Sequence, residues 1–390
     1  MTEKKDALEK HCEWKGKIEV VSRVKLDGRE SLSLAYTPGV AEVCKQIEKD
    51  PDSGFDLTRR WNMVAVITDG SAVLGLGDVG PRAAMPVMEG KAALFKEFGG
   101  VDAFPICIDS KDTDEIVRTV RLISYSFGGV NLEDISAPRC FEIEKRLRKC
   151  CDIPIFHDDQ HGTAVVAGAA LINACKLTGR KLSGLKAVFS GAGAAACAVA
   201  EFLEGMGVAD IIICDSKGII QADRMKDEHR KALADRTNPR SVKGGLKDAL
   251  KGADLFIGLS VANLVTKDDI RTMAKDPIIF AMANPVPEIA PEDALAAGAS
   301  VVGTGRSDYY NQINNVLAFP GIFKGALSVR AKDITPSMKR AAAQAIADFT
   351  GEITKERILP GAFEKGLGDA VAKAVAKAAI EDGVTKGAEK

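Results

Sequence analysis

Two short acidic segments, each following an apolar run, offer the residue types from which a metal site is built. Residues 153–163 (Ile-Pro-Ile-Phe-His-Asp-Asp-Gln-His-Gly-Thr) place Asp158 and Asp159 after such a run, and residues 129–135 place Glu133 and Asp134 in the same way. Carboxylates are costly to bury unless they are paired, and at the carboxyl end of a strand they point to where ligands bind in α/β proteins. The two segments together predict one site for a hard cation, Mg²⁺ or Mn²⁺, both of which prefer oxygen ligands.

A simpler interpretation is that Asp158 or Asp159 caps the helix expected from Gly162. That role accounts for at most one carboxylate and leaves Glu133 and Asp134 without a purpose. Adjacent residues of a strand point to opposite faces, so Glu133 and Asp134 can share an ion only where their strand unravels.

A glycine-rich turn predicts a dinucleotide site. The pattern G-x-G-x-x-A at residues 191–196 follows an expected strand and opens an expected helix, and Asp215 ends the next strand. Such a turn lets the backbone approach a pyrophosphate and presents free N–H groups; the alternative is a bare packing turn. Asp215 favours a ribose 2′-hydroxyl and hence NAD, whereas Ser216 and Lys217 could hold a 2′-phosphate, so NADP stays open. The cofactor-binding candidates here are Gly191, Ala192, Gly193, Ala194, Ala195 and Asp215.

Two further side chains have both a chemical and a structural interpretation. Tyr36 lies at the bend that Pro38 and Gly39 impose, and its structural alternative is an amphipathic tyrosine that seals a core. Lys91 lies in a helix expected over residues 85–98, and its alternative is a solvated helix lysine. His157 and His161 are expected to be loop hydrogen-bonders rather than metal ligands.

These residues are positioned by elements that alternate between strand and helix. Residues 1–60 are expected to be mostly helical, and residues 62–70 with 73–78 to form a hairpin. Strands and helices then alternate to residue 177, which predicts a largely parallel sheet. From residue 185 a second strand–turn–helix series predicts a doubly wound sheet, followed by a loop over 311–321 and closing helices over 337–349 and 370–380.

Composition excludes several classes of protein. The chain has 390 residues, 46% hydrophobic and 27% charged, with a net charge of −1, as in an ordinary globular protein of two domains. Charges of both signs are interspersed, so nucleic acid is not an expected partner. The polar start and the lack of a long apolar segment predict no secretion signal and no membrane span, hence a cytoplasmic protein. The nine cysteines show no C-x-x-C spacing, which indicates reduced thiols.

The chain resembles the malic enzymes, in particular their short bacterial and archaeal form. The resemblance runs from about Tyr36 to Asn315 and depends on motifs that occur in the right order. They are residues 36–40, Thr68-Asp69-Gly70 with 74–78, 86–91, 131–135, 156–164, 191–196, Ala283-Asn284-Pro285, and Asn314-Asn315 before Phe319-Pro320-Gly321.

The resemblance implies oxidative decarboxylation of malate to pyruvate and CO₂, with hydride transfer to NAD or NADP and a requirement for Mg²⁺ or Mn²⁺. By position, Lys91 matches the general base, Tyr36 the general acid and Asp158 an aspartate that assists the base. A base of lowered pKa is expected, because burial and a nearby dication both disfavour a lysine's charge. The metal ligands matched are Glu133, Asp134 and Asp159; Asn315 matches a substrate contact and Asn284 one near the nicotinamide ribose.

One departure concerns the substrate carboxylate. The larger enzymes of the family carry an acid and an arginine after Asp69-Gly70, where this chain has Ser71 and Ala72. Arg82 and the metal are candidate replacements for that arginine, by proximity in sequence only.

The fold expected is α/β with two domains. One is an N-terminal substrate and metal domain, residues 1–158, on which C-terminal helices of residues 323–390 pack; the other is a Rossmann-type doubly wound parallel sheet, residues 159–322. The family also suggests a homodimer or larger homo-oligomer. Two rival functions stay open: a dehydrogenase of 2-hydroxy acids that does not decarboxylate, and a catalytically inactive regulator that senses dinucleotides.

Overall fold

A computed structural model describes residues 2–386. It contains two sheets, and the first is a four-stranded parallel sheet of order β2-β1-β3-β4. Its strands are β1 (Met63–Thr68), β2 (Asp102–Cys107), β3 (Gly129–Leu132) and β4 (Ile155–His157). The two central strands are almost wholly buried, as expected where helices cover both faces of a parallel sheet. The helices between these strands are α5 (Gly80–Gly99), α6 (Thr113–Ile123) and α7 (Arg139–Cys150).

The second sheet has six strands in the order β10-β9-β8-β5-β6-β7, a doubly wound arrangement in which only β7 runs antiparallel. Its strands are β5 (Lys186–Ser190), β6 (Asp210–Asp215), β7 (Gly218–Ile219), β8 (Leu255–Gly258), β9 (Ile278–Ala281) and β10 (Val301–Thr304). Its helices are α9 (Ala194–Gly205), α10 (Glu228–Arg236), α11 (Leu246–Leu250), α12 (Lys267–Arg271) and α13 (Pro291–Ala296). Parallel strands followed by helices confirm the α/β fold that the alternation predicted.

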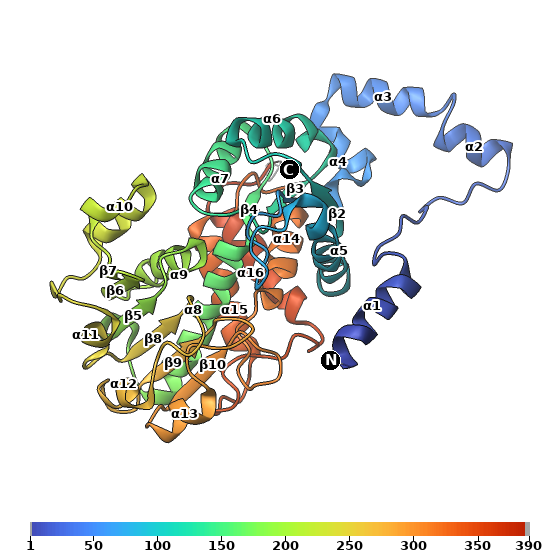
Figure 1. Ribbon diagram of the computed structural model, residues 1–390. Helices are drawn as coiled ribbons and strands as arrows, with labels where there is room; N and C mark the ends of the chain where they lie inside the picture. Colours follow the sequence, from blue (N-terminus) through green and yellow to red (C-terminus); the bar gives the residue numbers. More distant parts are fainter. Residues whose placement is uncertain (1, 387–390) are drawn as a thin grey trace.

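A long buried helix, α8 (Asp158–Thr178), joins the two sheets (Figure 1). It is rich in alanine and glycine, which lets other helices approach its backbone closely; a Cβ on Gly168 would lie 2.5 Å from the ring of Phe202. The closing helices are α14 (Phe319–Ser328), α15 (Pro336–Phe349) and α16 (Leu367–Glu381). Helix α14 packs against α5, and α15 and α16 pack against each other. The end of the chain thus returns to the helix layer of the first sheet.

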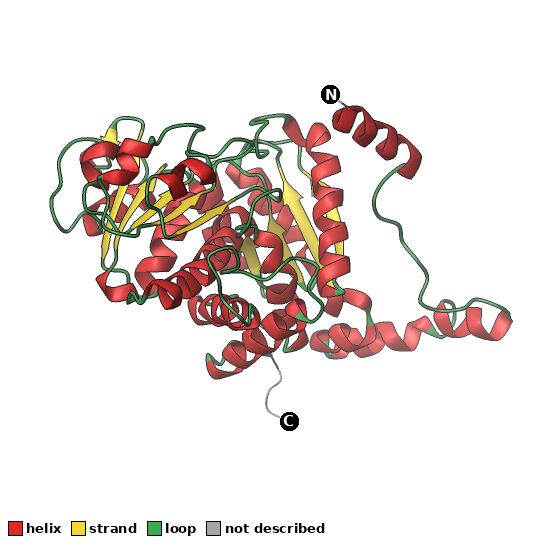
Figure 2. Cartoon of the chain, turned by 90° about the horizontal axis from the view of Figure 1, so that it is seen from below, coloured by secondary structure: helices red, strands yellow, loops and turns green. Residues whose placement is uncertain are grey.

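The first helices form a projection that we call the N-terminal arm, residues 2–50. It comprises α1 (Thr2–Trp14), α2 (Arg29–Ala35) and α3 (Val40–Lys49). Figures 1 and 2 both show α1 and α2 away from the two sheets, joined by an extended strand-less segment. The rest of the described chain, from residue 51 on, is called the body. The arm joins it before α4 (Gly54–Leu57), where the first buried residues of the described chain, Gly54 and Phe55, occur.

Three local predictions were wrong. Residues 73–78 form a loop instead of the second strand of a hairpin, because both edges of β1 are taken by the parallel strands β2 and β3. The loop closes on itself, since Leu76 and Gly77 donate their N–H groups to the carbonyl of Val73. Helix α8 begins at Asp158, four residues earlier than expected, and α14 begins at Phe319 inside the predicted loop.

Two further features concern the described chain as a whole. All nine cysteines are free thiols. Within residues 2–386, no helix combines the length and the apolar character that crossing a membrane requires.

Candidate active site

The end of β3 positions Glu133 and Asp134. The strand stops at Leu132, and Asp134 takes a left-handed backbone conformation with φ of 54°, which non-glycine residues rarely adopt. Its carbonyl accepts a hydrogen bond from the N–H of Ala72 at 2.9 Å, which fixes the acidic segment that follows β3. This is the unravelling that allows both carboxylates to face one point.

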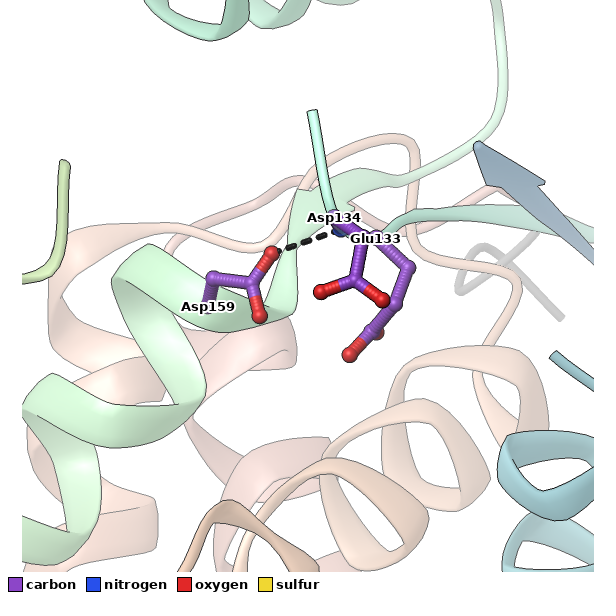
Figure 3. Close-up of side chains that lie close together, drawn as sticks. All are labelled: Glu133, Asp134 and Asp159. Carbon is purple, nitrogen blue, oxygen red and sulfur yellow. Dashed lines mark hydrogen bonds between the residues drawn. The ribbon is translucent and has the colours of Figure 1, made fainter. Parts of the chain in front are cut away.

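The first turn of α8 positions Asp158 and Asp159. The residue that precedes the helix is His157, whose side chain makes no capping hydrogen bond, so the proposal that an aspartate caps the helix is wrong. Both aspartates lie inside the first turn, where the helix dipole favours negative charge. Asp159 also accepts a hydrogen bond through Oδ2 from the backbone N–H of Asp134, at 2.8 Å. This bond joins the two acidic segments (Figure 3).

Glu133, Asp134 and Asp159 form one cluster, with a ligand atom of each within 4.8 Å of the others. Figure 3 shows the three carboxylates facing a common space. Oδ2 of Asp134 is buried without a hydrogen-bond partner, and burial, together with Asp159 and Glu133, raises the pKa of Asp134 to about 9. Crowded carboxylates with an unsatisfied oxygen fit a divalent cation, because its charge would offset their repulsion and desolvation.

Lys91 lies against this cluster from α5. Its Nζ is 2.6 Å from Oδ2 of Asp158, 2.9 Å from Oε1 of Glu133 and 4.3 Å from the ring centre of Phe319. The side chain is buried, so it is not a solvated helix lysine. Burial lowers the pKa of Lys91, but Asp158 and Glu133 more than offset this and leave the pKa raised. The lowering was expected beside a bound dication, whose charge would offset that of these carboxylates, so it stays a prediction for the metal-loaded protein.

Asn315 lies beside the first turn of α8. It begins a short helical turn, Asn315–Leu317, and its Cβ would be 2.9 Å from a Cβ placed on Gly162. The same added Cβ would lie 1.9 Å from Oδ1 of Asp158. The backbone of α8 thus needs glycine at 162 to admit both neighbours.

The glycine-rich turn lies between β5 and α9. Gly191 has φ of 111°, and a Cβ there would lie 2.4 Å from the carbonyl oxygen of Leu259, so only glycine fits. Gly193 immediately precedes α9, and Ala194 and Ala195 form its first turn. The turn therefore has the strand–turn–helix context that phosphate binding requires.

Asp215 is the last residue of β6, and Asn284 lies just beyond the end of β9. Both are at the same edge of the second sheet as the glycine-rich turn. Oδ1 of Asp215 accepts a hydrogen bond from the N–H of Lys217 at 2.8 Å, and Arg224 lies 3.8 Å from it. Asn284 is exposed. A free ribose hydroxyl could bind Asp215, and Arg224 and Lys217 are cations that could contact a 2′-phosphate.

Tyr36 does not join these residues. It ends α2 on the N-terminal arm, and its side chain is 67% exposed. It therefore does not seal a core either.

Sequence reasoning missed the residues that support the site from behind. Glu144 on α7 accepts hydrogen bonds from His161 Nε2 at 2.8 Å and from the N–H of His157 at 3.1 Å. Lys339 on α15 lies 3.2 Å from the other ring nitrogen of His161. The ring of His161 is thus a hydrogen-bonder, as expected, whereas both ring nitrogens of His157 are buried without a hydrogen-bond partner. Nothing in the sequence pairs His161 with α7 and α15.

A second missed carboxylate, Glu288, is completely buried. It accepts hydrogen bonds from the N–H groups of Ser260 and Ala283, at 2.9 and 3.0 Å. It thereby joins the loops that follow β8 and β9.

Arg139 contacts Ser71, one of the two positions at which this chain departs from the larger enzymes of the family that it resembles. It donates to Oγ of Ser71 at 2.9 Å and pairs with Asp69 at 2.8 Å. Arg82, the candidate from proximity in sequence, has an exposed side chain in the first turn of α5. The signal for Arg139 was absent from the sequence, because 68 residues separate it from Ser71.

Comparisons with known proteins agree along the whole chain. The family model described as malic enzyme, N-terminal domain, matches residues 15–148, and that described as malic enzyme, NAD binding domain, matches residues 160–380. The chain is 56% identical over 390 residues to the bifunctional malic/malolactic enzyme of Bacillus subtilis, covering 99% of this chain and 95% of that protein. It is 54% identical over 374 residues to an NAD-dependent malic enzyme of Geobacillus stearothermophilus, covering 95% and 78%. The crystal structure of malic enzyme from Pyrococcus horikoshii superposes with a TM-score of 0.94 at 46% identity, covering 97% of this chain and 92% of that one.

Proposed function

Since the chain belongs to the malic enzyme family, we propose that it converts malate to pyruvate and CO₂ with a nicotinamide dinucleotide and a divalent cation, at the cluster around Lys91. The single observation that carries this assignment is the meeting of a buried lysine with three clustered carboxylates, whose ligand atoms lie within 4.8 Å of one another. A simple dehydrogenase has no need of such a cation site.

Lys91 is the proposed base. The hydroxyl of malate gives its proton to Nζ while C2 is oxidised, which makes a β-keto acid. Asp158 positions Nζ, 2.6 Å away, and stabilises the lysine when it carries the proton. Asn315, beside the same turn of α8, is the proposed substrate contact.

Glu133, Asp134 and Asp159 are the proposed ligands of Mg²⁺ or Mn²⁺. When bound, the cation supplies positive charge that polarises the C2 oxygen during loss of CO₂ and offsets the carboxylates that hold the proton on Lys91. The buried Oδ2 of Asp134, which has no hydrogen-bond partner, supports this assignment.

Tyr36 is the proposed acid. When the C3–C4 bond breaks, its electron pair stays with the three-carbon fragment, and C3 must then receive a proton. The Tyr36 hydroxyl gives that proton. Lys91 has taken one proton from the C2 hydroxyl, so the substrate loses one proton and gains one over the two steps. The net products are pyruvate, CO₂ and the reduced dinucleotide.

The dinucleotide is proposed to bind at the edge formed by residues 191–195, Asp215 and Asn284. It supplies the acceptor for the hydride that leaves C2. The pyrophosphate is placed at the start of α9, where the N–H groups are free. The pairing of Asp215 with the N–H of Lys217 leaves its second oxygen for a ribose hydroxyl, which favours NAD, and a test with both dinucleotides decides between NAD and NADP.

The remaining assignments concern organisation. We divide the chain into residues 1–158, with 323–390 packed on them, and residues 159–322, the division between the two sheets. We place the enzyme in the cytoplasm as a homodimer or larger homo-oligomer. The nine free thiols support a reducing compartment.

The deciding experiment measures two products from the same reaction. Malate labelled at the C4 carboxyl is incubated with NAD or NADP and with Mn²⁺, Mg²⁺ or a chelator, and both labelled CO₂ and reduced dinucleotide are followed. We expect the two in equal amounts and neither with the chelator. Reduced dinucleotide without CO₂ would indicate the non-decarboxylating dehydrogenase, and binding of dinucleotide without turnover would indicate the regulator.

A further inference from the structure

Tyr36 is held on the N-terminal arm and not at the cluster that needs its proton. It ends α2, a helix that packs on α3 of the same arm. Figures 1 and 2 agree that α2 lies away from α5 and from the first sheet. The side chain is 67% exposed. In the single chain, therefore, the site built around Lys91 lacks the acid proposed for it.

The arm is fixed at both ends. Near its start, the Nζ of Lys17 donates to the carbonyl of Pro86 at 2.7 Å and the N–H of Lys17 to Glu89 at 3.3 Å, both on α5. At its end, α3 continues into α4 and the buried Phe55. The segment between these two anchors, which contains α2, thus projects as a loop with defined ends.

The arm has no core of its own. Between residues 6 and 53 no residue is buried. Ten of its large apolar side chains are exposed, among them Val20 at 85%, Leu34 at 71% and Leu32 at 50%. Ordering a chain costs conformational entropy, which burial of apolar surface normally offsets. An exposed apolar surface of this extent marks a contact with another protein.

Two elements next to the site offer a matching surface. Leu74 and Leu76, in the loop that follows β1, are 71% and 68% exposed, and Met85 and Val87 on α5 are 38% and 40% exposed. This loop is next to the metal cluster, because Ala72 donates to the carbonyl of Asp134. Val87 is one turn of helix before Lys91, on the same side of α5. Apolar side chains are thus exposed on two elements that adjoin the site from which the acid is missing.

We propose that the arm of one copy docks on the body of a second copy, so that Tyr36 completes the site of its partner. The proposal rests on the proposed role of Tyr36 and adds that this role is exercised between chains. In a twofold dimer each arm then covers the loop at residues 74–76 and the start of α5 on the other copy, and two equal sites are made.

The test is complementation between two inactive variants. Tyr36→Phe removes the acid, and Lys91→Ala removes the base from the other half of the site. Differently tagged copies of the two variants are co-expressed, and the heterodimer is isolated by two successive affinity steps. It contains one body with Lys91 that receives an intact Tyr36 from its partner. We therefore expect about half of the wild-type activity per heterodimer, although each variant alone is inactive.

A second heterodimer, for which the proposal predicts the opposite result, serves as the control. The double variant Tyr36→Phe/Lys91→Ala is paired with a wild-type copy. If the acid acts between chains, both sites of this heterodimer are damaged and it is inactive; if the acid acts within a chain, about half of the activity remains. A heterodimer of Tyr125→Phe with Lys91→Ala is the matched control for the first pair. Tyr125 is an exposed tyrosine outside the arm, so this heterodimer should retain activity.

A readout that does not depend on turnover locates position 36. A benzophenone amino acid is placed there, and copies grown on light and heavy nitrogen are mixed before illumination. We expect crosslinked peptides that join a light and a heavy chain and that contain residues of the 71–79 loop or of α5. Crosslinks confined to chains of one label, in a mixture whose light–heavy dimers are verified by native mass spectrometry, would overturn the proposal.

The failure of this proposal differs from failure of the proposed function. A wild-type protein that releases no CO₂ from malate defeats the function itself. An active wild type with an inactive complementation heterodimer defeats only the exchange of Tyr36 between chains. A Tyr36→Phe variant with full activity also overturns the proposal, because Tyr36 then has no part in the site.

Discussion

At the scale of single residues, the charge on Lys91 is set by its neighbours. Asp158 is fully buried and keeps one oxygen for Lys91, at 2.6 Å, while its other oxygen has no hydrogen-bond partner. A buried ion pair of this kind gives little net stability, so its value here is positional. Glu133 contacts both Lys91, at 2.9 Å, and Asn131, at 2.9 Å. Asp158 is therefore the carboxylate that belongs to Lys91 rather than to the metal cluster.

Asp158→Asn should reduce turnover and leave metal binding nearly intact. The amide keeps the size of the side chain but cannot stabilise the lysine when it takes a proton, so we expect kcat to fall about 10²–10⁴-fold. Mn²⁺ affinity, measured by calorimetry, should change little, because Glu133, Asp134 and Asp159 are untouched. Asp159→Asn is the matched control and should lose Mn²⁺ affinity. An equal loss of affinity in both variants would contradict the division of roles.

The pKa of Asp134 makes the stability of the protein without metal depend on pH. Burial, with Asp159 and Glu133, raises it to about 9 in the folded state, against about 4 in an unfolded chain. The folded state therefore binds this proton more tightly. The stability that the proton contributes is fully present below about pH 4 and is lost as the pH rises through about 9.

A cation would take the place of that proton. We therefore expect Mn²⁺ to raise the melting temperature more at about pH 8.5 than at about pH 6, since the metal-free protein is the one that loses stability. Calorimetry of chelator-treated and Mn²⁺-loaded samples measures this difference. In Asp134→Asn the dependence on pH should be much weaker. An increase in melting temperature that is equal at the two pH values contradicts the argument.

At the scale of elements, the start of α8 determines whether the site is assembled. Gly162→Ala would improve helix propensity, yet its Cβ would lie 1.9 Å from Oδ1 of Asp158 and 2.9 Å from Cβ of Asn315. Asp158 must then move, and Lys91 moves with it. We expect kcat to fall by at least about 10²-fold, as for displacement of a catalytic group by about 1 Å, while circular dichroism shows a folded protein.

Gly205→Ala is the control for Gly162→Ala. Gly205 is the last residue of α9, and a Cβ there would meet nothing within 4 Å. This change should stabilise the protein by up to about 1 kcal/mol with no effect on activity. Equal activity of the two alanine variants would show that α8 tolerates a displaced Asp158.

The sequence predicted these elements well where local pattern decides them. Apolar runs followed by acidic or glycine-rich residues gave the strands and the carboxylate cluster, because parallel strands end at a common edge. Contacts between distant segments were not predictable. Val73 pairs within its own loop because β2 and β3 already occupy β1, and Glu144 meets His161 only through the packing of α7 on β4. Tyr36 was singled out by its motif, but its position depends on the arm, which no local pattern predicts.

At the scale of the whole molecule, the proposed exchange of Tyr36 between chains predicts that activity depends on association. If each site needs two chains, a monomer is inactive, and the rate per chain must fall when the protein is diluted below the dissociation constant of the dimer. A site complete within one chain would show no such loss. Mass photometry on the same dilution series gives the fraction of dimer independently.

Leu34→Glu should move this dilution curve to higher concentration. Leu34 is 71% exposed on α2, and a charge on a surface that becomes buried costs affinity unless it is paired, so we expect the dissociation constant to rise at least about tenfold, the equivalent of about 1.4 kcal/mol. At saturating protein concentration kcat should return to that of the wild type, because Tyr36 and Lys91 are unchanged. Leu122→Glu, at a leucine that is 62% exposed on α6, serves as the control and should leave the curve in place. A Leu34→Glu variant that is monomeric by mass photometry yet fully active would show that each chain works alone.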